Sequence, residues 1–188
     1  MFKLNIIDES KPASHLNLDY LSKFGNGKVF IETGTYKGDT VKLALSAGFE
    51  FIHSIELDTE LYDKAFEMFK DEDRVKIWYG DSIDCLKEIL KRIDEPATFW
   101  LDAHASGDLR GGRSGGSPVV DELNIIKAHN TKTHTIFIDD RRLFGSAEWS
   151  YVSEQDALNI IKEINPDYNI NFLEGHVPGD VLCATVKW

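Results

Sequence analysis

Aspartates follow two apolar segments of the chain and are its strongest candidates for chemistry. Asp102 ends the segment 97–102, and the pair Asp139 and Asp140 ends the segment 135–140. If both segments are strands of one parallel sheet, their carboxyl ends meet at the same edge. Three carboxylates gathered there would repel one another unless a cation lay between them. A hard divalent ion such as Mg²⁺ prefers oxygen ligands of this kind, whereas surface acids that cap loops are the alternative interpretation.

A second candidate is the turn that follows the apolar segment 28–33. It reads Glu32-Thr33-Gly34-Thr35-Tyr36-Lys37-Gly38. Gly34 allows the backbone to approach a ligand closely, and Gly38 opens a helix whose free N–H groups face the same ligand. The G-x-G-x-x-G pattern of dinucleotide sites is absent, and an acid in the turn suits a ligand with positive charge better than a pyrophosphate. A tight connection without any ligand is the alternative.

Further polar residues follow other expected strands. Glu56 lies roughly 20 residues beyond Gly34, the spacing at which a carboxylate accepts hydrogen bonds from ribose hydroxyls. Asp81 follows a third strand, where a helix N-cap is an equally good interpretation. His104 stands two residues past Asp102. Its ordinary pKa of about 6.5 suits a general base at neutral pH, and a histidine without a role in a polar loop is the alternative.

The hydrophobic pattern predicts the elements that position these residues. Strands are expected at 28–33, 51–57, 75–79, 97–102, 135–140, 168–173 and 181–188. Helices are expected at 16–24, 39–47, 59–70, 82–92, 118–129 and 153–164. Short strands that alternate with helices are typical of right-handed β-α-β units, whereas the last two strands lack an intervening helix. The expected fold is therefore α/β, a doubly wound, mostly parallel seven-stranded sheet with helices on both faces and a C-terminal antiparallel hairpin.

Length and charge narrow the function further. The 188 residues fit one domain, 1–188, with an N-terminal helical segment at 1–27 and a glycine-rich lid loop at 105–117, for which an uninvolved loop is the alternative. A net charge of −11 argues against a nucleic-acid or anionic-membrane partner.

Without a leader or an apolar run of about 18 residues, the protein is expected to be cytoplasmic. Cys85 and Cys183 lack metal-ligand spacing and are expected to be core thiols.

The turn from Glu32 to Gly38 resembles the first motif of class I S-adenosylmethionine-dependent methyltransferases, although Thr35 and Tyr36 stand where a further glycine is common. The resemblance covers the whole chain and implies a Rossmann-like methyltransferase fold. It implies that Glu56 binds the adenosyl ribose and that Asp81 and Ser82 contact the adenine. The residues assigned to the cofactor on this basis are Glu32, Thr33, Gly34, Thr35, Tyr36, Gly38, Glu56, Leu57, Gly80, Asp81, Ser82 and Asp102.

The segments 101–104 and 138–140 resemble the metal-dependent O-methyltransferases, both the catechol type and, more closely, the macrocin-type sugar O-methyltransferases. The resemblance implies that Asp102, Asp139 and Asp140 hold Mg²⁺ or Mn²⁺, which chelates two neighbouring substrate hydroxyls. Asp102 and His104 are then assigned to catalysis, although an acidic residue commonly stands at the place of His104 in the sugar-modifying relatives. The residues assigned to the substrate are Arg110, Arg113, Arg141, Arg142 and Tyr36.

The sequence therefore predicts an S-adenosylmethionine-dependent O-methyltransferase that uses a divalent metal to activate a hydroxyl of a vicinal diol, with a sugar favoured over a catechol. The expected partner is a small-molecule or glycan acceptor, without nucleic acid and without membrane insertion. A nicotinamide-dependent oxidoreductase would share Glu56 but would require the missing glycine pattern. A non-catalytic cofactor-binding domain would not need the three aspartates. A homo-oligomer and membership of a larger chain both stay open.

Overall fold

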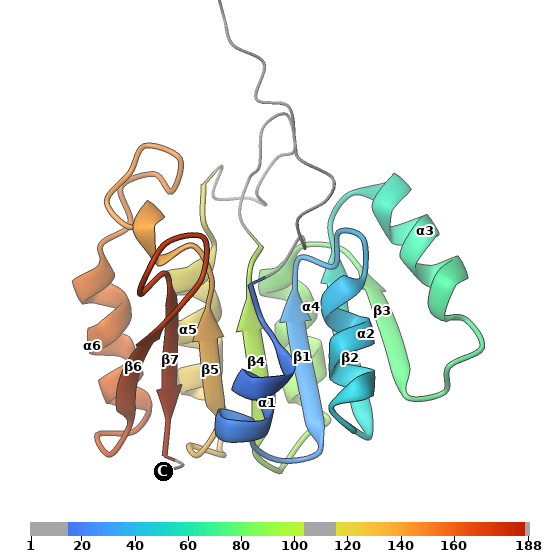
Figure 1. Ribbon diagram of the computed structural model, residues 1–188, viewed down its shortest axis with the longest axis horizontal. Coiled ribbons are helices and arrows are strands. Elements are labelled where there is room, and N and C mark those ends of the chain that lie inside the picture. The colour runs from blue at the N-terminus through green and yellow to red at the C-terminus, as the bar shows by residue number, and fades with distance from the viewer. Residues whose placement is uncertain (1–14, 104–115, 187–188) are drawn as a thin grey trace, which may run out of the picture.

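A single mixed sheet with helices on both faces forms the body of the protein (Figure 1). The computed structural model describes residues 15–103 and 116–186. The strands are β1 (Val29–Thr33), β2 (Phe51–Glu56), β3 (Val75–Tyr79), β4 (Ala97–Leu101), β5 (Thr135–Ile138), β6 (Asn169–Leu173) and β7 (Val181–Thr185). The helices are α1 (Leu18–Phe24), α2 (Asp39–Ser46), α3 (Thr59–Phe69), α4 (Ser82–Leu90), α5 (Val119–Ala128) and α6 (Glu154–Ile164), with a 3-10 turn η1 (Arg141–Leu143).

The strand order is β3-β2-β1-β4-β5-β7-β6, and neighbours from β3 to β5 run parallel. β7 lies antiparallel between β5 and β6. The predicted fold class, including the C-terminal antiparallel hairpin, is confirmed. Because the chain order reverses direction between β1 and β4, the turns after these two strands border the crevice in which doubly wound sheets bind ligands.

The sheet separates two hydrophobic clusters, and alternate side chains of each central strand point into different ones. Ile31 and Phe99 join the cluster with α4, α5 and α6, whereas Phe30 and Trp100 join the cluster with α1, α2 and α3. In Figure 1, α1 and α2 lie in front of the sheet and α4 and α5 behind it. Burial on both faces explains why β1 and β4 read as almost continuous apolar runs. It also holds their carboxyl ends in a fixed register.

Aspartates at the strand ends start two of the helices. The Asp58 carboxylate accepts hydrogen bonds from the N–H groups of Glu60 and Leu61 at 2.9 and 3.0 Å. The Asp81 carboxylate accepts from the Ile83 N–H at 2.9 Å. These bonds satisfy amide groups that have no partner inside the helix, and the negative charge lies favourably at the helix N-terminus. The interpretation of Asp81 as a helix cap is confirmed, and a second role toward a ligand remains compatible with it.

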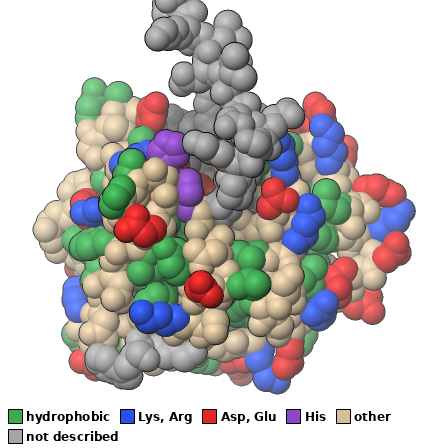
Figure 2. Space-filling view, in the orientation of Figure 1, with side chains coloured by type: hydrophobic (Ala, Val, Ile, Leu, Met, Phe, Trp, Pro, Cys, Tyr) green, Lys and Arg blue, Asp and Glu red, His purple; other side chains and the backbone are tan. Residues whose placement is uncertain are grey.

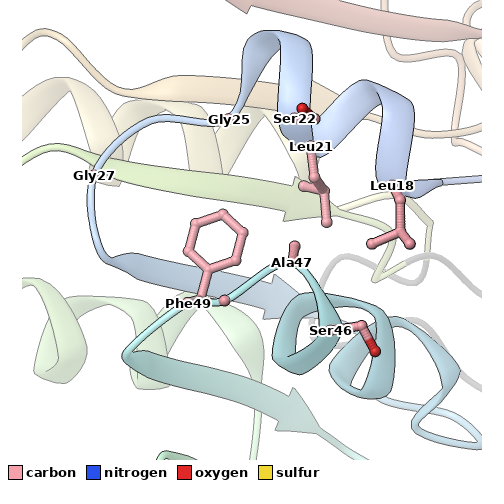
Figure 3. A pocket seen from close by; sticks show the side chains of 9 residues that line it. Leu18, Leu21, Ser22, Gly25, Gly27, Ser46, Ala47 and Phe49 are labelled. Carbon is pink, nitrogen blue, oxygen red and sulfur yellow. The ribbon is translucent and has the colours of Figure 1, made fainter.

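Helix α1 packs on the same face of the sheet as α2. Its residues Leu21 and Phe24 are buried, whereas Leu18 is exposed beside a hollow of about 410 Å³ between α1 and the end of α2 (Figure 3). Phe49, which also lines this hollow, lies two residues before the start of β2, so the hollow lies at the opposite end of the strands from the acidic residues. None of the helices in the described ranges is long and apolar enough to cross a membrane.

Candidate active site

The glycine turn after β1 joins three strands at their carboxyl ends. Gly34 has a φ of +90°, and a Cβ atom there would lie 2.7 Å from the Asp102 carbonyl oxygen. The N–H groups of Gly34 and Thr35 donate to the Ile55 carbonyl oxygen at 2.9 and 3.1 Å. These two amides therefore bind the neighbouring strand, and the assignment of Gly34 and Thr35 to the cofactor stays a prediction. Glycine is required here for the close approach of the turn after β4.

Replacing Gly34 with alanine is expected to reduce the free energy of unfolding by about 2 kcal/mol more than replacing Gly48. Both glycines have a φ close to +90°, so the backbone strain of alanine is similar at the two positions. A Cβ at Gly48 would meet no atom within 4 Å, whereas a Cβ at Gly34 would overlap backbone. Urea unfolding of the two variants measures the difference. Equal losses of stability would contradict the close approach.

Glu32, near the end of β1, is a buried acid next to this turn. Its side chain is 1% exposed, and the Ser54 hydroxyl donates to its Oε2 at 2.5 Å. Burial raises the pKa of Glu32 to about 8, against the lowering effect of hydrogen bonds from Ser54 and Thr40. At neutral pH this side chain is therefore a neutral acid inside the protein. Its assignment to the cofactor stays a prediction, and any contribution would come through the shape of the turn rather than through charge.

Glu56 stands at the end of β2 as a pre-positioned hydrogen-bond acceptor. Its two oxygens accept the N–H groups of Tyr36 and Asp58 at 2.8 and 2.9 Å. A carboxylate can accept about four hydrogen bonds, so capacity for a pair of hydroxyls remains. Tyr36 has a φ of +48°, a left-handed conformation that is costly for an aromatic residue and is stabilised here by the bond to Glu56. Strained residues of this kind cluster at ligand sites.

The remaining residues assigned to the cofactor lie on adjacent turns. The Gly80 N–H donates to the Glu56 carbonyl oxygen at 2.9 Å, which joins the turns after β2 and β3. Asp81 and Ser82 follow at the start of α4, and Leu57 exposes its side chain beside Glu56. The structure thus places the turns after β1, β2 and β3 next to one another along one edge of the sheet, where one extended ligand could contact all three.

Glu122 is a buried acid of this site that the sequence interpretation missed. It lies on α5 with 1% exposure, and its Oε1 has no hydrogen-bond partner among the described residues. Burial raises its pKa to about 7, hydrogen bonding to Ser82 and Thr33 opposes that shift, and the charges of Asp81 and Asp102 add to it. A local signal existed, because Glu122 falls on the apolar stripe of its helix. That stripe consists of Val119, Glu122, Leu123 and Ile126.

Replacing Glu122 with Gln is expected to stabilise the protein at alkaline pH. In the folded chain the Glu122 carboxyl group stays protonated up to about pH 7, whereas its ordinary pKa is 4.5. Between these two pH values the folded state therefore binds more protons than the unfolded state. The free energy of unfolding therefore falls as pH rises from about 4.5 to 7 and stays lowered above it. The shift is equivalent to about 3 kcal/mol, which Gln removes.

Urea unfolding at pH 5 and pH 9 checks this prediction, with the exposed Glu148→Gln as the matched control. The free energy of unfolding of Glu122→Gln should exceed that of the unsubstituted protein by more at pH 9 than at pH 5. The Glu148→Gln control should show no such difference between the two pH values. An equal effect of Glu122→Gln at both pH values would show that Glu122 is ionised in the folded protein.

The aspartate pair after β5 meets a histidine from the N-terminal segment. His15 Nδ1 lies 3.3 Å from both carboxylate oxygens of Asp139. Ligand atoms of His15, Asp139 and Asp140 all lie within 4.8 Å of one another, and Asp102 is not a member of this group within the described ranges. The hydrogen bond to Asp139 raises the pKa of His15, with partial burial opposing it. Asp102 lies on the adjacent turn, where its N–H donates to the Thr33 carbonyl oxygen at 3.1 Å.

Arg142 balances part of the negative charge of this edge. Its Nη1 contacts carboxylate oxygens of both Asp140 and Asp180, and its backbone N–H donates to Asp180 at 2.9 Å. Asp140 has a φ of +53°, a left-handed conformation that aspartate tolerates better than most residues. Both aspartates are buried, so the guanidinium offsets charges that water cannot screen. The assignment of Arg142 to the substrate stays a prediction.

Arg141 is held on the outer side of the same turn. Its Nε donates to Glu154 at 2.6 Å, its Nη1 donates to the Gly179 carbonyl oxygen at 3.2 Å, and its guanidinium lies 4.0 Å from the centre of the Phe172 ring. It lines a hollow of about 720 Å³ together with Glu154, Phe172 and the exposed Tyr151. These contacts hold the Arg141 side chain in place, and its assignment to the substrate stays a prediction.

Several assignments fall outside the described residues. They are His104, Arg110, Arg113 and most of the loop 105–117. Their predicted roles are neither supported nor contradicted by the structure.

Solved proteins with this architecture include methyltransferases. A proposed rRNA methylase from Clostridium thermocellum superimposes with a TM-score of 0.60 at 15% identity, over 98% of this chain and 99% of its own. An O-methyltransferase from Bacillus cereus, solved with S-adenosylhomocysteine, gives a TM-score of 0.58 at 14% identity, over 89% of this chain and 77% of its own. This chain has the class I methyltransferase fold.

The methyltransferase fold by itself does not define the reaction. Spermidine synthase from Thermotoga maritima also superimposes, with a TM-score of 0.54 at 14% identity, over 86% of this chain and 54% of its own. No known family model matches the sequence, and no curated protein sequence is similar to it. At such low identities the likeness establishes the fold, and the chemistry has to be argued from the residues of the site.

Proposed function

We propose that this protein is an S-adenosylmethionine-dependent O-methyltransferase whose acceptor carries two neighbouring hydroxyls, with a sugar favoured over a catechol. The observation that supports it most is the placement of Glu56 and of the buried pair Asp139 and Asp140 along one edge of a methyltransferase fold. Glu56 is suited to the ribose of a cofactor. The aspartate pair is suited to a divalent cation at the neighbouring acceptor site.

The residues of the first three turns fit the cofactor. Glu56 is held by the Tyr36 and Asp58 amides in an orientation that leaves acceptor capacity for two ribose hydroxyls. Asp81, fixed by its capping bond, would accept a hydrogen bond from the adenine amino group. Gly34 lets the turn after β1 lie close against the turn after β4, which sets the position of both turns. These residues would bind the cofactor and hold it in one orientation, and such positioning supplies a large part of catalysis in transfer reactions.

The residues of the fourth and fifth turns fit a cation and an acceptor. Asp139 and Asp140 would hold the cation, and Asp102 on the adjacent turn would orient the acceptor or supply a further oxygen ligand. When bound, the cofactor supplies an electrophilic methyl group and the cation supplies Lewis acidity that lowers the pKa of an acceptor hydroxyl. His104, next to Ala103 in the chain, is the proposed base for that hydroxyl proton.

Calorimetric titration of S-adenosylmethionine into the full chain tests the proposal, with and without Mg²⁺ or Mn²⁺. It is combined with a methyl-transfer assay on free sugars and catechols. We expect cofactor binding without metal, and methyl transfer to a vicinal diol only with metal. Failure to bind the cofactor under any condition would refute the methyltransferase function. Cofactor binding with metal-independent transfer would refute the metal and preserve the rest.

A further inference from the structure

We propose that His15 is a metal ligand, so that the cation site is a mixed nitrogen and oxygen centre formed by His15, Asp139 and Asp140. Such a centre would bind a transition-metal dication such as Mn²⁺ more tightly than Mg²⁺. The inference rests on the proposed function only for the use of the cation in catalysis, because the binding site follows from the geometry of these three residues.

The spacing of the ligand atoms fits a common metal. Atoms bound at about 2.1 Å from one ion lie about 3.0 Å apart at a right angle and about 3.4 Å apart at the tetrahedral angle. His15 Nδ1 and the Asp139 oxygens are separated by 3.3 Å, which lies between these limits. The Asp140 ligand atom lies within 4.8 Å of both. The three side chains therefore lie close enough together to share one cation.

The charges around the group call for a divalent cation. Asp139, Asp140 and Asp180 carry one negative charge each when ionised, and Arg142 returns one positive charge. With His15 neutral, as it must be to bind a cation through Nδ1, the three carboxylates and one guanidinium among the described residues sum to two negative charges. Burial of uncompensated charge costs several kcal/mol per ion in a protein interior. A cation of charge two would balance the group.

His15 is held in place by the segment that carries it. The next residue, Leu16, is buried in the cluster that also contains Leu21 and Phe24 of α1, and this anchors the chain beside β5. The His15 side chain is half-buried and points at the aspartate pair rather than into solvent. His15 and Leu16 together therefore bring an imidazole to the carboxyl end of β5 and anchor it there.

The ligand type decides which cation is favoured. Imidazole nitrogen suits the first-row transition metals, whereas Mg²⁺ is usually bound by carboxylates and water. Loss of His15 should therefore weaken Mn²⁺ binding more than Mg²⁺ binding. A site of carboxylates alone would respond to the same change equally for both metals.

The neighbouring His176 offers a matched control. Figure 2 shows histidine side chains close together in the upper part of this face, and the rings of His15 and His176 lie 5.9 Å apart at 67°. His176 is exposed and is not a member of the group that could hold a metal. Replacing it removes a histidine from the same neighbourhood and leaves the proposed ligands intact.

The test measures the binding of Mn²⁺ and of Mg²⁺ to the metal-free full chain. Calorimetry gives the affinity for both ions, and electron paramagnetic resonance reports on bound Mn²⁺. His15→Ala and His15→Asn are each expected to weaken Mn²⁺ binding at least 10-fold, the lower end of the range for groups that tune a metal site. Mg²⁺ binding should change less than about threefold. His176→Ala should leave both affinities unchanged. Circular dichroism establishes that each variant is folded.

Three results would overturn the inference. If His15→Ala and His15→Asn, both folded, bind Mn²⁺ as tightly as the unsubstituted protein, His15 is not a ligand. If Asp102→Asn abolishes binding while the His15 variants retain it, the site consists of the three aspartates expected from the sequence. Absence of any metal binding would also refute the proposal, whereas the methyltransferase function fails only if S-adenosylmethionine does not bind or no methyl group is transferred.

Discussion

Replacing Asp139 with Asn is expected to reduce methyl transfer at least 100-fold while S-adenosylmethionine still binds with an affinity within about twofold. Substitutions beside metal ligands typically cost 10- to 100-fold, and loss of a ligand charge should cost more. Asp139 is 2% exposed, lies against His15 and accepts the Asp140 N–H at 2.9 Å. Asn preserves the size and this backbone bond but removes the charge. None of these bonds joins Asp139 to the proposed cofactor site on the turns after β1 to β3.

Transfer of a labelled methyl group measures the first effect, and calorimetry with S-adenosylmethionine measures the second. Asp63→Asn is the control, because Asp63 is exposed on α3 and far in sequence from every proposed ligand. Thermal unfolding should show no loss of stability for Asp139→Asn, since removing one charge relieves repulsion with Asp140. Activity within threefold of the unsubstituted enzyme would show that Asp139 does not hold a cation required for the reaction.

Replacing Glu56 with Gln is expected to weaken S-adenosylmethionine binding about 30-fold. Hydrogen bonds to a charged group contribute about 1.5–3 kcal/mol each, and a loss near 2 kcal/mol corresponds to this factor. The amide of Gln also places a donor against one of the two N–H groups that Glu56 now accepts, from Tyr36 and Asp58. The turn that holds Tyr36 in its left-handed conformation should loosen as a result.

Calorimetry with S-adenosylmethionine, together with thermal unfolding, separates loss of the ribose contacts from loss of the turn. Glu60→Gln is the control, because the Glu60 side chain on α3 is 80% exposed and pairs with Lys64 on the surface. A stable Glu56→Gln variant with weakened binding would support the ribose contact. Unchanged affinity would remove Glu56 from the cofactor site and would leave only its structural role.

The architecture was largely predictable because its signals are local. Strands buried on both faces read as short apolar runs, and helices show apolar residues at helical spacing with capping residues at their starts. The boundaries differ from prediction by a few residues, as at β5, which ends at Ile138 rather than at 140. Glu122 was accessible to the same logic, since an acid on a buried stripe of α5 marks an unusual position.

The sequence by itself therefore determined the α/β fold, the placement of acids at the strand ends and the resemblance of the first turn to methyltransferases. Only the tertiary structure decided which of these acids meet. His15 lies 124 residues before Asp139 in the chain, and no local pattern couples them. Arg142 contacts Asp180 for the same reason, because β7 inserts between β5 and β6 and brings its preceding residue to the turn after β5. Side-chain periodicity reports burial along one element, whereas contacts between strand ends depend on strand order, which only the packed sheet establishes.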